Sequence, residues 1–333
     1  MSSVLLGNTY NNSHRRTDID ILRGIGILTV VWYHFGMQDT LNQYFASFHM
    51  IIFFFVSGYC FKERSLRSAP KQYVKKKSRA FLVPYIIWTV IFTVLNYIID
   101  YFTQSPCGVG DYLLNIVESF MKFGAVWFLI ALFITTIVGG GILDYIHNRI
   151  IQILVGMLIS FTAVIANGFS IEPIFRWQHA FIGVPAFIIG FQFKNIDIKK
   201  INVCSKVLYA VSFGVLGYLC SVFNGNAVFS RLEFGRSFLL FYIGALLSVI
   251  AWLFIAVIID GDKHRLLCGI LSFFGRHSIY ILITHQLLIK IVFSVTSRVS
   301  EGLISVMLGF VIVILIEIPI CIICKTKIFR WMF

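Results

Sequence analysis

Charged residues are scarce in this chain, and acidic residues are the scarcest of them. Asp, Glu, Lys and Arg make up 13% of its 333 residues, whereas 58% of the residues are hydrophobic. A soluble domain is about 25% charged and about 45–50% apolar. A globule of this length cannot shield so much apolar surface from water, so the composition excludes an ordinary soluble domain. It indicates instead that lipid surrounds much of the chain.

The sequence also lacks the paired cysteine spacing of a structural zinc site. Seven cysteines are present, an odd number, and six of them fall in or beside apolar segments. Cys321 and Cys324 have the CxxC spacing, but they lie in a hydrophobic run without a second pair of ligands. We therefore expect no metal centre and no permanently bound cofactor, and we interpret the cysteines as small apolar side chains.

Linkers, internal repeats and low-complexity segments are missing as well. No loop is long enough to form a separate domain, so we predict a single membrane-embedded domain over residues 1–333. Residues 1–18 and 325–333 are expected to be cytoplasmic tails. The first apolar segment carries Asp20 and Arg23 and has no small-residue cleavage site, so we expect no cleavable signal peptide.

Long apolar segments are what the sequence has in abundance. A membrane-spanning helix needs ~20 predominantly apolar residues. The candidate segments are residues 19–37, 44–61, 80–99, 122–143, 150–167, 180–193, 203–223, 237–259, 268–293 and 302–324. The ninth segment is the most polar, which predicts that it faces the protein interior. The predicted fold class is an all-α, polytopic membrane helix bundle of about ten transmembrane helices.

The distribution of Lys and Arg predicts the orientation of this bundle. If the N-terminus is inside, the inside segments hold 19 of the 28 basic residues and the outside loops hold only four. Cytoplasmic loops carry such an excess of basic residues, so we expect both termini in the cytoplasm. The net charge of +13 therefore fixes topology. Nucleic-acid binding is not expected, because no basic stretch lies in a soluble domain.

Ionisable residues in the first segment are functional candidates, since such groups are costly inside a membrane. Arg23 and His34 are eleven residues apart, which places them ~20° apart on one helix face and ~16 Å apart along the axis. Arg16 and Asp20 lie near the same stripe, toward the cytosol. The structural alternative is that Arg23 reaches lipid headgroups, Asp20 pairs with it, and His34 is a satisfied core histidine.

The second segment adds another histidine, His49, near the outer mouth, where it can meet His34. Deeper in the same segment, Ser57 precedes Gly58, a residue that permits close helix approach; the alternative is a packing seam without function. The following basic stretch, residues 62–79, either contacts anionic lipid or binds an anionic cytosolic ligand. Lys76 and Arg79 are spaced to present two cations to one phosphate group.

The order of these motifs resembles the acyltransferase-3 family of integral-membrane acyltransferases. Arg23 and His34 match its Arg-x10-His pattern, and FHMIIFFFVSGY resembles its second-span signature. Residues 76–79 resemble its Arg-x-x-Arg pattern, with Lys76 replacing the first Arg. RAFLVPYIIW, WFLIALF from Trp127 and GRHSIYILITHQLL, which contains His285, are similar to its sugar O-acetyltransferase branch. Residues 145–265 contribute little to the resemblance.

The resemblance implies transfer of an acyl group, with acetyl expected, from acyl-CoA to a hydroxyl of a cell-surface glycan or its lipid-linked precursor. It also implies a multi-pass protein of a bacterial cytoplasmic membrane. The predicted general base is His34, since an imidazole can take a hydroxyl proton near neutral pH. Asp20 and Arg23 complete the predicted catalytic set. The predicted donor- and substrate-binding residues are Arg16, His49, Ser57, Lys76, Arg79, Trp127 and His285.

Several alternatives remain at this stage. Ser57 as a covalent nucleophile would change the mechanism, although direct transfer needs no acyl-enzyme. A membrane transporter or exporter of a polysaccharide or small metabolite also has many spans with buried charges, but no inverted repeat is visible. A polytopic sensor or scaffold would need a soluble output domain, and none is visible. The sequence leaves a homo-oligomer open.

Overall fold

The fold is an all-α, polytopic membrane helix bundle. The computed structural model describes residues 16–36, 39–103, 126–171, 174–261, 264–299, 302–324 and 326. Its long helices are α1 (Thr17–Tyr33), α2 (Thr40–Tyr59), α4 (Pro70–Thr103), α6 (Trp127–Tyr145), α7 (Arg149–Gly168), α8 (Trp177–Phe193), α9 (Val203–Asn224), α10 (Phe238–Ile259), α11 (Arg265–Arg276), α12 (Ser278–Val299) and α13 (Gly302–Cys324). The short elements are α3 (Ser65–Ser68), η1 (Ile174–Arg176), η2 (Ile198–Lys200), η3 (Phe229–Arg231) and the antiparallel strands β1 (Ala227–Val228) and β2 (Glu233–Phe234).

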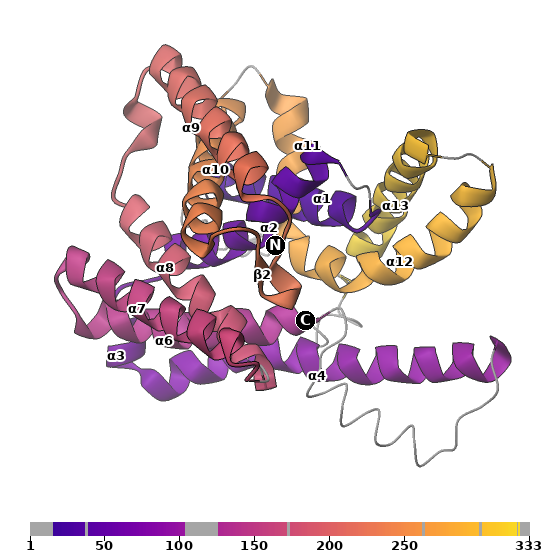
Figure 1. The fold of residues 1–333 in the computed structure, drawn as a ribbon, viewed down its shortest axis with the longest axis horizontal. Coiled ribbons are helices and arrows are strands. Elements are labelled where there is room, and N and C mark those ends of the chain that lie inside the picture. Colours follow the sequence, from indigo (N-terminus) through magenta and orange to yellow (C-terminus); the bar gives the residue numbers. More distant parts are fainter. Residues whose placement is uncertain are drawn as a thin grey trace, which may run out of the picture.

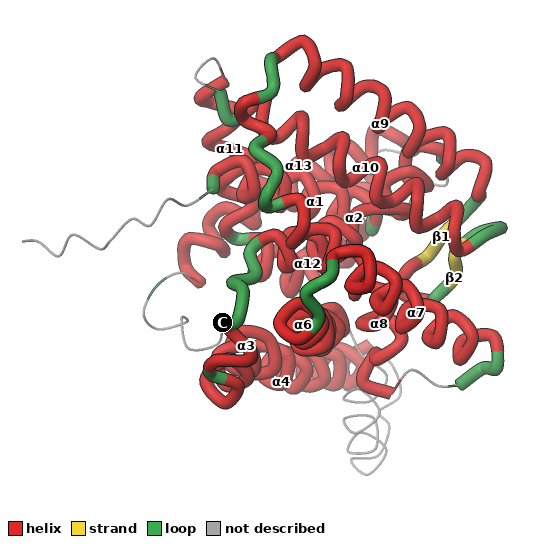
Figure 2. Tube along the Cα trace, turned by 90° about the vertical axis from the view of Figure 1, so that its left-hand side faces the viewer, coloured by secondary structure: helices red, strands yellow, loops and turns green. Residues whose placement is uncertain are grey.

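One end of the bundle, which we call the inner face, gathers the segments predicted to be cytoplasmic. Arg16, just before α1, lies over the ring of Tyr59 at the end of α2, with the guanidinium carbon 5.4 Å from the ring centroid. Gln192, near the end of α8, donates a hydrogen bond of 3.0 Å to the carbonyl of Arg149 at the start of α7. Figure 2 shows α3 and α11 together at this end.

The opposite end, the outer face, carries the β1–β2 hairpin. Gln43 near the start of α2 donates a hydrogen bond of 2.5 Å to the carbonyl of Ser221 near the end of α9. Asn167 near the end of α7 donates to the carbonyl of Leu232 in the hairpin, over 3.2 Å. The chain therefore passes back and forth between the two faces, as the alternating topology predicted from the charge distribution requires (Figure 2).

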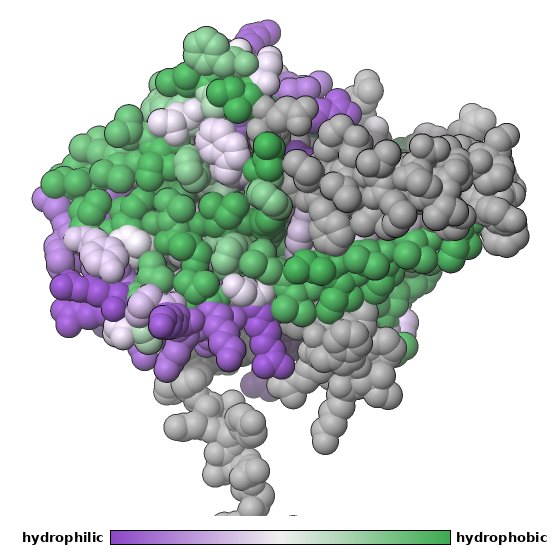
Figure 3. Space-filling view, turned by 90° about the horizontal axis from the view of Figure 1, so that it is seen from below, coloured by the Kyte–Doolittle hydropathy of each residue, from purple (hydrophilic) through white to green (hydrophobic). Residues whose placement is uncertain are grey.

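Eight helices in the described part of the chain are long and apolar enough to cross a membrane. Among them, α4, α7, α9 and α13 bury only a minority of their residues inside the protein, because their outer sides face lipid instead of protein. Figure 3 shows one face of the molecule with a broad apolar band and hydrophilic side chains along its lower edge. A band of this kind matches a hydrocarbon layer bounded by headgroups.

The first two predicted spans, α1 and α2, lie at the centre of the bundle (Figure 1). They are more polar than the lipid-facing helices, and α1 is only 17 residues long. Both are largely buried by neighbouring helices, so they need less hydrophobicity than a helix that faces lipid. This central position brings the polar residues of α1 and α2 into the protein interior and makes room for a site.

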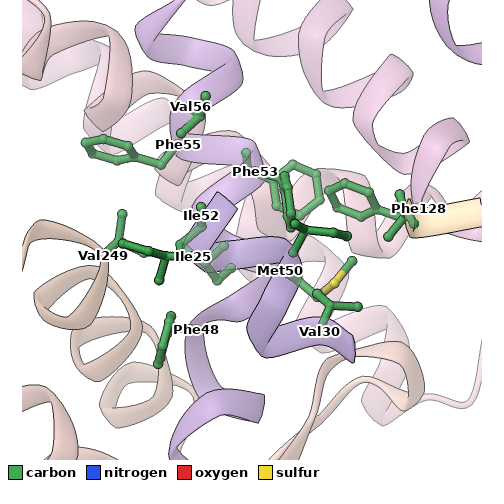
Figure 4. Close-up of a cluster of buried hydrophobic side chains, with 14 of the residues drawn as sticks. Ile25, Val30, Phe48, Met50, Ile52, Phe53, Phe55, Val56, Phe128 and Val249 are labelled. Atoms are coloured by element: carbon green, nitrogen blue, oxygen red, sulfur yellow. The ribbon is translucent and has the colours of Figure 1, made fainter. Parts of the chain in front are cut away.

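Aromatic side chains fill the centre of the bundle. Phe48, Phe54 and Phe55 of α2 are fully buried, as is Phe128 of α6. Figure 4 shows part of this cluster, in which side chains of α1, α2, α6 and α10 meet. On the α8 side, Gly58 of α2 lies against the backbone of a neighbouring phenylalanine so closely that a methyl group would overlap it. The expected close approach at Gly58 is therefore present.

The ninth predicted span is not one helix. The sequence predicted one span over 268–293, but the structure ends α11 at Arg276 and starts α12 at Ser278. Just before the division, Gly275 of α11 lies directly against the backbone of α1, where a side chain would overlap it. The ring Nδ1 of His277 then donates to the carbonyl of Phe273, over 2.7 Å, at the break.

Two other boundaries differ from expectation. The basic stretch 62–79 is not a single loop, since its second half forms the start of α4, which begins at Pro70. The short sixth segment, 180–193, is extended toward the outer face, because η1 and α8 together run over Ile174–Phe193. The predicted outer loop 100–121 and the two tails lie mostly outside the described residues.

Candidate active site

Three histidines from three helices line one cavity near the outer face. His34 follows the end of α1, His49 belongs to α2, and His285 belongs to α12. The cavity has a volume of about 80 Å³. The rings of His34 and His285 have centroids 5.0 Å apart, and the ring of Tyr33 is 5.1 Å from that of His49. Segments that are distant in the sequence therefore place several imidazoles around one small space.

Hydrogen bonds fix the tautomer of two of these rings. The Nδ1 atom of His49 lies 2.7 Å from the carbonyl oxygen of Phe45, and that of His285 lies 2.8 Å from the carbonyl of Ile281. A carbonyl oxygen only accepts, so Nδ1 carries the proton in both rings and Nε2 keeps its lone pair. The Nε2 atom of His285 is buried and hydrogen-bonds to none of the described residues.

His34 is the exposed histidine of the three. It occupies the C-cap position of α1, where the helix ends and the side chain reaches the mouth of the cavity. The amide of Gln286 lies 3.4 Å from Nε2 of His34 and can donate only to a lone pair on that nitrogen. An incoming hydroxyl that displaced this weak contact would meet an unprotonated imidazole nitrogen, which is the form that can accept a proton.

A wider cavity of about 540 Å³ adjoins the first one and shares Tyr33 and His34 with it. Its walls come from the start of α2 and from the β1–β2 hairpin. Besides Tyr33 and His34, six of its twelve lining residues have side chains with hydrogen-bonding groups, namely Asp39, Asn42, Gln43, Asn226, Arg231 and Glu233. A small apolar and histidine-lined cavity thus connects with a larger polar vestibule, an arrangement that suits a polar ligand presenting one group to the histidines.

Trp127, the first residue of α6, forms another wall of the histidine cavity. Its ring lies 4.9 Å from the ring of His179, and the guanidinium carbon of Arg176 lies 5.6 Å from its centroid. The Nη1 atom of Arg176 and the Nε2 atom of His179 lie 3.1 and 3.2 Å from the carbonyl oxygen of Ser230, a cavity residue. These contacts hold the hairpin against α6 and α8.

The inner end of α1 carries the second group of predicted site residues. Arg16 forms a hydrogen-bonded ion pair of 2.6 Å with Asp18, a carboxylate with no exposed surface. This bond raises the pKa of the Arg16 guanidinium above its ordinary value. About two turns further along, Arg23 lies 3.5 Å from the carboxylate of Asp20 and 3.5 Å from the sulfur of Cys60. Two half-exposed cations therefore line the inner end of the helix that ends at His34.

A third cation approaches this group from α4. Lys77 is partly buried between the rings of Tyr73 and Phe81, and it interacts electrostatically with Arg23. Its neighbours Lys76 and Arg79 are exposed on the surface of α4. The predicted pair therefore borders the inner face, while Lys77 is the side chain of this stretch that turns toward α1.

Seven of the ten predicted site residues form two separate groups, and the other three lie elsewhere. His34, His49, Trp127 and His285 line the histidine cavity, whereas Arg16, Asp20 and Arg23 lie at the inner end of α1. Lys76 and Arg79 lie on α4, and Ser57 lines neither described cavity. Arg23 and His34 are ~16 Å apart along one helix, so they cannot touch the same reacting atom.

Several residues of the site were missed from the sequence. Asp18 is only two residues from Asp20 and could have been found by the same search for charges in the first span. Gln286 lies beside His285, but an isolated amide gives no signal. Arg176 and His179 lie at the start of a short segment, and their role in holding Ser230 depends on a hairpin that hydropathy does not predict.

Histidine side chains are common metal ligands, so the histidine cavity was compared with a metal site. In the described ranges, no group of three or more His, Cys, Asp and Glu side chains is arranged to hold a metal ion. The geometry is instead that of imidazoles supported by carbonyl oxygens, which prepares them for proton transfer and hydrogen bonding.

Comparison with known proteins agrees with the motif order. No curated protein and no solved structure matches the chain. One family does match, over residues 16–325, and its description is an acyltransferase domain. The match begins at Arg16, spans both the inner cation group and the histidine cavity, and covers nearly all of the described residues. The chain is therefore a multi-pass membrane protein that belongs to the acyltransferase-3 family of membrane acyltransferases.

Proposed function

We propose that this protein transfers an acyl group, acetyl in the first instance, from acyl-CoA to a hydroxyl of a cell-surface glycan or of its lipid-linked precursor. His34 serves as the general base. Membership of the family favours this activity over the transporter or exporter alternative. The proposed location is a bacterial cytoplasmic membrane, with the inner face toward the cytosol and the vestibule toward the outside.

The observation that carries the proposal is the state of the imidazoles in the cavity. A sugar hydroxyl is a poor nucleophile until a base takes its proton. The amide nitrogen of Gln286 lies 3.4 Å from Nε2 of His34, a contact that suits an unprotonated Nε2, and His34 is exposed and lines both cavities. His49 and His285 are buried behind it and have their Nδ1 protons bound to carbonyls. We assign them to positioning hydroxyl groups of the acceptor, which can donate to the Nε2 lone pairs.

The donor enters from the other end of α1 in this proposal. CoA carries several phosphate charges, and Arg16, Arg23, Lys77, Lys76 and Arg79 supply cations at the inner face. A thioester that extends from this group toward His34 follows α1 for ~16 Å. Arg23 then binds the donor instead of the reacting atoms, and Asp20 orients its guanidinium.

The reaction itself is a direct transfer. The acceptor oxygen attacks the thioester carbonyl while Nε2 of His34 takes the hydroxyl proton. A carbon–oxygen bond forms, the carbon–sulfur bond breaks, and CoA leaves as a thiolate that recovers the proton from His34. No acyl-enzyme is required, and Ser57, which lines neither cavity, has no role in this route.

The polar vestibule supports a hydroxyl-rich acceptor. Its amide and carboxylate side chains can hydrogen-bond the several hydroxyls of a sugar, and the shared residue His34 lies where one hydroxyl would enter the histidine cavity. The test is mass spectrometry of surface glycans from cells with and without the protein. We expect a loss of one acetyl increment per modified hydroxyl in its absence. Identical glycans, with no acylated alternative acceptor, would contradict the proposal.

A further inference from the structure

Asp144, near the end of α6, holds the cytoplasmic loop that precedes α4. Its carboxylate accepts three backbone hydrogen bonds from this loop, one from the N–H of Arg64 at 2.7 Å, one from Leu66 at 2.8 Å and one from Arg67 at 2.9 Å. The first reaches Oδ1 and the other two reach Oδ2. The side chain is only 4% exposed, so these bonds replace nearly all of the water that a carboxylate would otherwise bind.

Asp144 lies beside a strongly basic segment, yet its hydrogen-bond partners are backbone N–H groups. Asp144 binds the backbone of the loop, and no ion pair with it is present among the residues that the structure describes. The side chains of Lys62, Arg64 and Arg67 are exposed. The negative charge of Asp144 is therefore stabilised by peptide N–H groups, and the cationic ends of the loop stay available for another anion.

The loop is fastened at its beginning as well. Nζ of Lys194 donates a hydrogen bond of 3.0 Å to the carbonyl of Phe61, whose ring packs 5.6 Å from that of Phe187. The preceding residue, Cys60, is the sulfur contact of Arg23. The segment between α2 and α4 is thus fixed to α6, α8 and α1, beside the cation group at the inner end of α1.

We propose that Asp144 is a positioning residue that holds the loop of residues 60–69 as a preformed subsite for the phosphate groups of the CoA donor. This inference rests on the proposed function, because it specifies how the donor is held. A loop ordered in advance loses less conformational entropy when it binds its ligand. Asp144 does not touch the donor; it acts through the position of Arg64 and Arg67.

The sign of the effect separates this role from simple electrostatics. In Asp144→Asn one carboxylate oxygen is replaced by an NH₂ group. This group is a donor and faces backbone N–H groups that are also donors, so at least one of the three hydrogen bonds is lost. The same change removes a negative charge near an anion site, which by charge alone strengthens CoA binding. The positioning role requires the opposite result, weaker binding of CoA.

The experiment measures the dissociation constant of CoA with the full-length protein in lipid nanodiscs. Asp144→Asn is expected to raise this constant roughly tenfold and to reduce its salt dependence, because fewer cations meet the phosphates. The matched control is Asp260→Asn, which removes the same charge from an ion pair of 2.7 Å with Lys199. It is expected to leave the constant within about twofold of that of the wild type.

A second variant and a second measurement guard against misfolding. Asp144→Glu keeps the charge but moves the oxygens by one methylene, so an intermediate loss of affinity is expected. In the wild type without CoA, the amides of Arg64, Leu66 and Arg67 should be protected from hydrogen exchange. CoA binding by Asp144→Asn that equals or exceeds that of the wild type, or freely exchanging amides at these positions, overturns the inference.

The same experiment separates the inference from the proposed function. A wild-type protein that binds CoA but transfers nothing from acetyl-CoA would contradict the function, while the effect of Asp144→Asn on CoA affinity would still decide the role of Asp144. A wild-type protein that binds no CoA would contradict both. Normal transfer by the wild type together with unchanged CoA affinity in Asp144→Asn would contradict the role of Asp144 and leave the proposed function intact.

Discussion

The ring centroids of His34 and His285 lie 5.0 Å apart, although 250 residues separate these histidines in the sequence. This contact joins the central helix α1 to α12, a helix on the side of the bundle (Figure 1). It also closes the cavity that His49 and Trp127 line from other directions. The proposed site therefore depends on how α12 is placed against α1, and the preceding helix α11 packs on the inner half of α1.

The exposed cations of α4 are expected to support donor binding without affecting the chemical step. Replacing both Lys76 and Arg79 with Ala should raise the KM for acetyl-CoA while kcat at saturating donor stays close to that of the wild type. Each lost cation removes a screened attraction to the CoA phosphates, so the salt dependence of KM should weaken as well. Steady-state kinetics at two ionic strengths measure both effects.

Lys77 provides a useful comparison on the same helix. It is partly buried against the ring of Phe81 and lies close to Arg23, a second cation, so Lys77→Gln should raise the KM for acetyl-CoA more than Lys76→Gln does. A double Lys76 and Arg79 variant that inserts normally and keeps the wild-type KM would leave these two residues as determinants of topology alone.

Hydropathy and charge predict much of the fold, because membrane spans need long apolar segments and basic residues mark one side of the membrane. The division at His277 could not be predicted in this way. The segment from Cys268 to Phe293 has the length and hydropathy of one span, although it is the most polar of the ten, and Gly275 lies against the backbone of α1 just before the break. Such a contact belongs to the tertiary structure and leaves no local signal.

The candidate site was predictable to a similar degree. Helical spacing places Arg23 and His34 on one face, and alternating topology brings His49 to the same end. The support of Asp144 for the basic loop was not predictable, since a single acid at the end of an apolar segment resembles many surface acids. Its three backbone partners appear only when the loop folds back onto α6.

Topology gives a direct test of the two faces. A reporter fused after Phe333 should be cytoplasmic, and one inserted in residues 100–121 should be external. Labelling can refine this result in a Cys107→Ser background. Cys60 lies at the inner face and should not react with a membrane-impermeant maleimide in intact cells, whereas Glu233→Cys in the hairpin should react. A cytoplasmic signal from 100–121 would reverse the assignment of the faces.

Glu317 is expected to hold α13 on α12. Its carboxyl group has no exposed surface and hydrogen-bonds to the hydroxyl of Thr284 at 2.8 Å. Glu317→Ala should lower stability by about 1–3 kcal/mol, because the bond is lost and a space remains. Glu317→Gln keeps an oxygen for Thr284 and should lower it by less than ~1 kcal/mol. Thermal unfolding in detergent measures both, and equal losses would contradict a hydrogen-bonding role.

The most direct test of the central claim is acetyl transfer from acetyl-CoA by purified protein in lipid, comparing His34→Gln with His49→Gln and His285→Gln. Gln keeps much of the size and hydrogen bonding of the imidazole but cannot take the proton. We expect His34→Gln to lose about 10²–10⁴-fold in turnover and still to bind CoA, whereas the other two variants lose less. Near-normal turnover in His34→Gln, with loss in His49→Gln or His285→Gln, would contradict the assignment of His34 as the base.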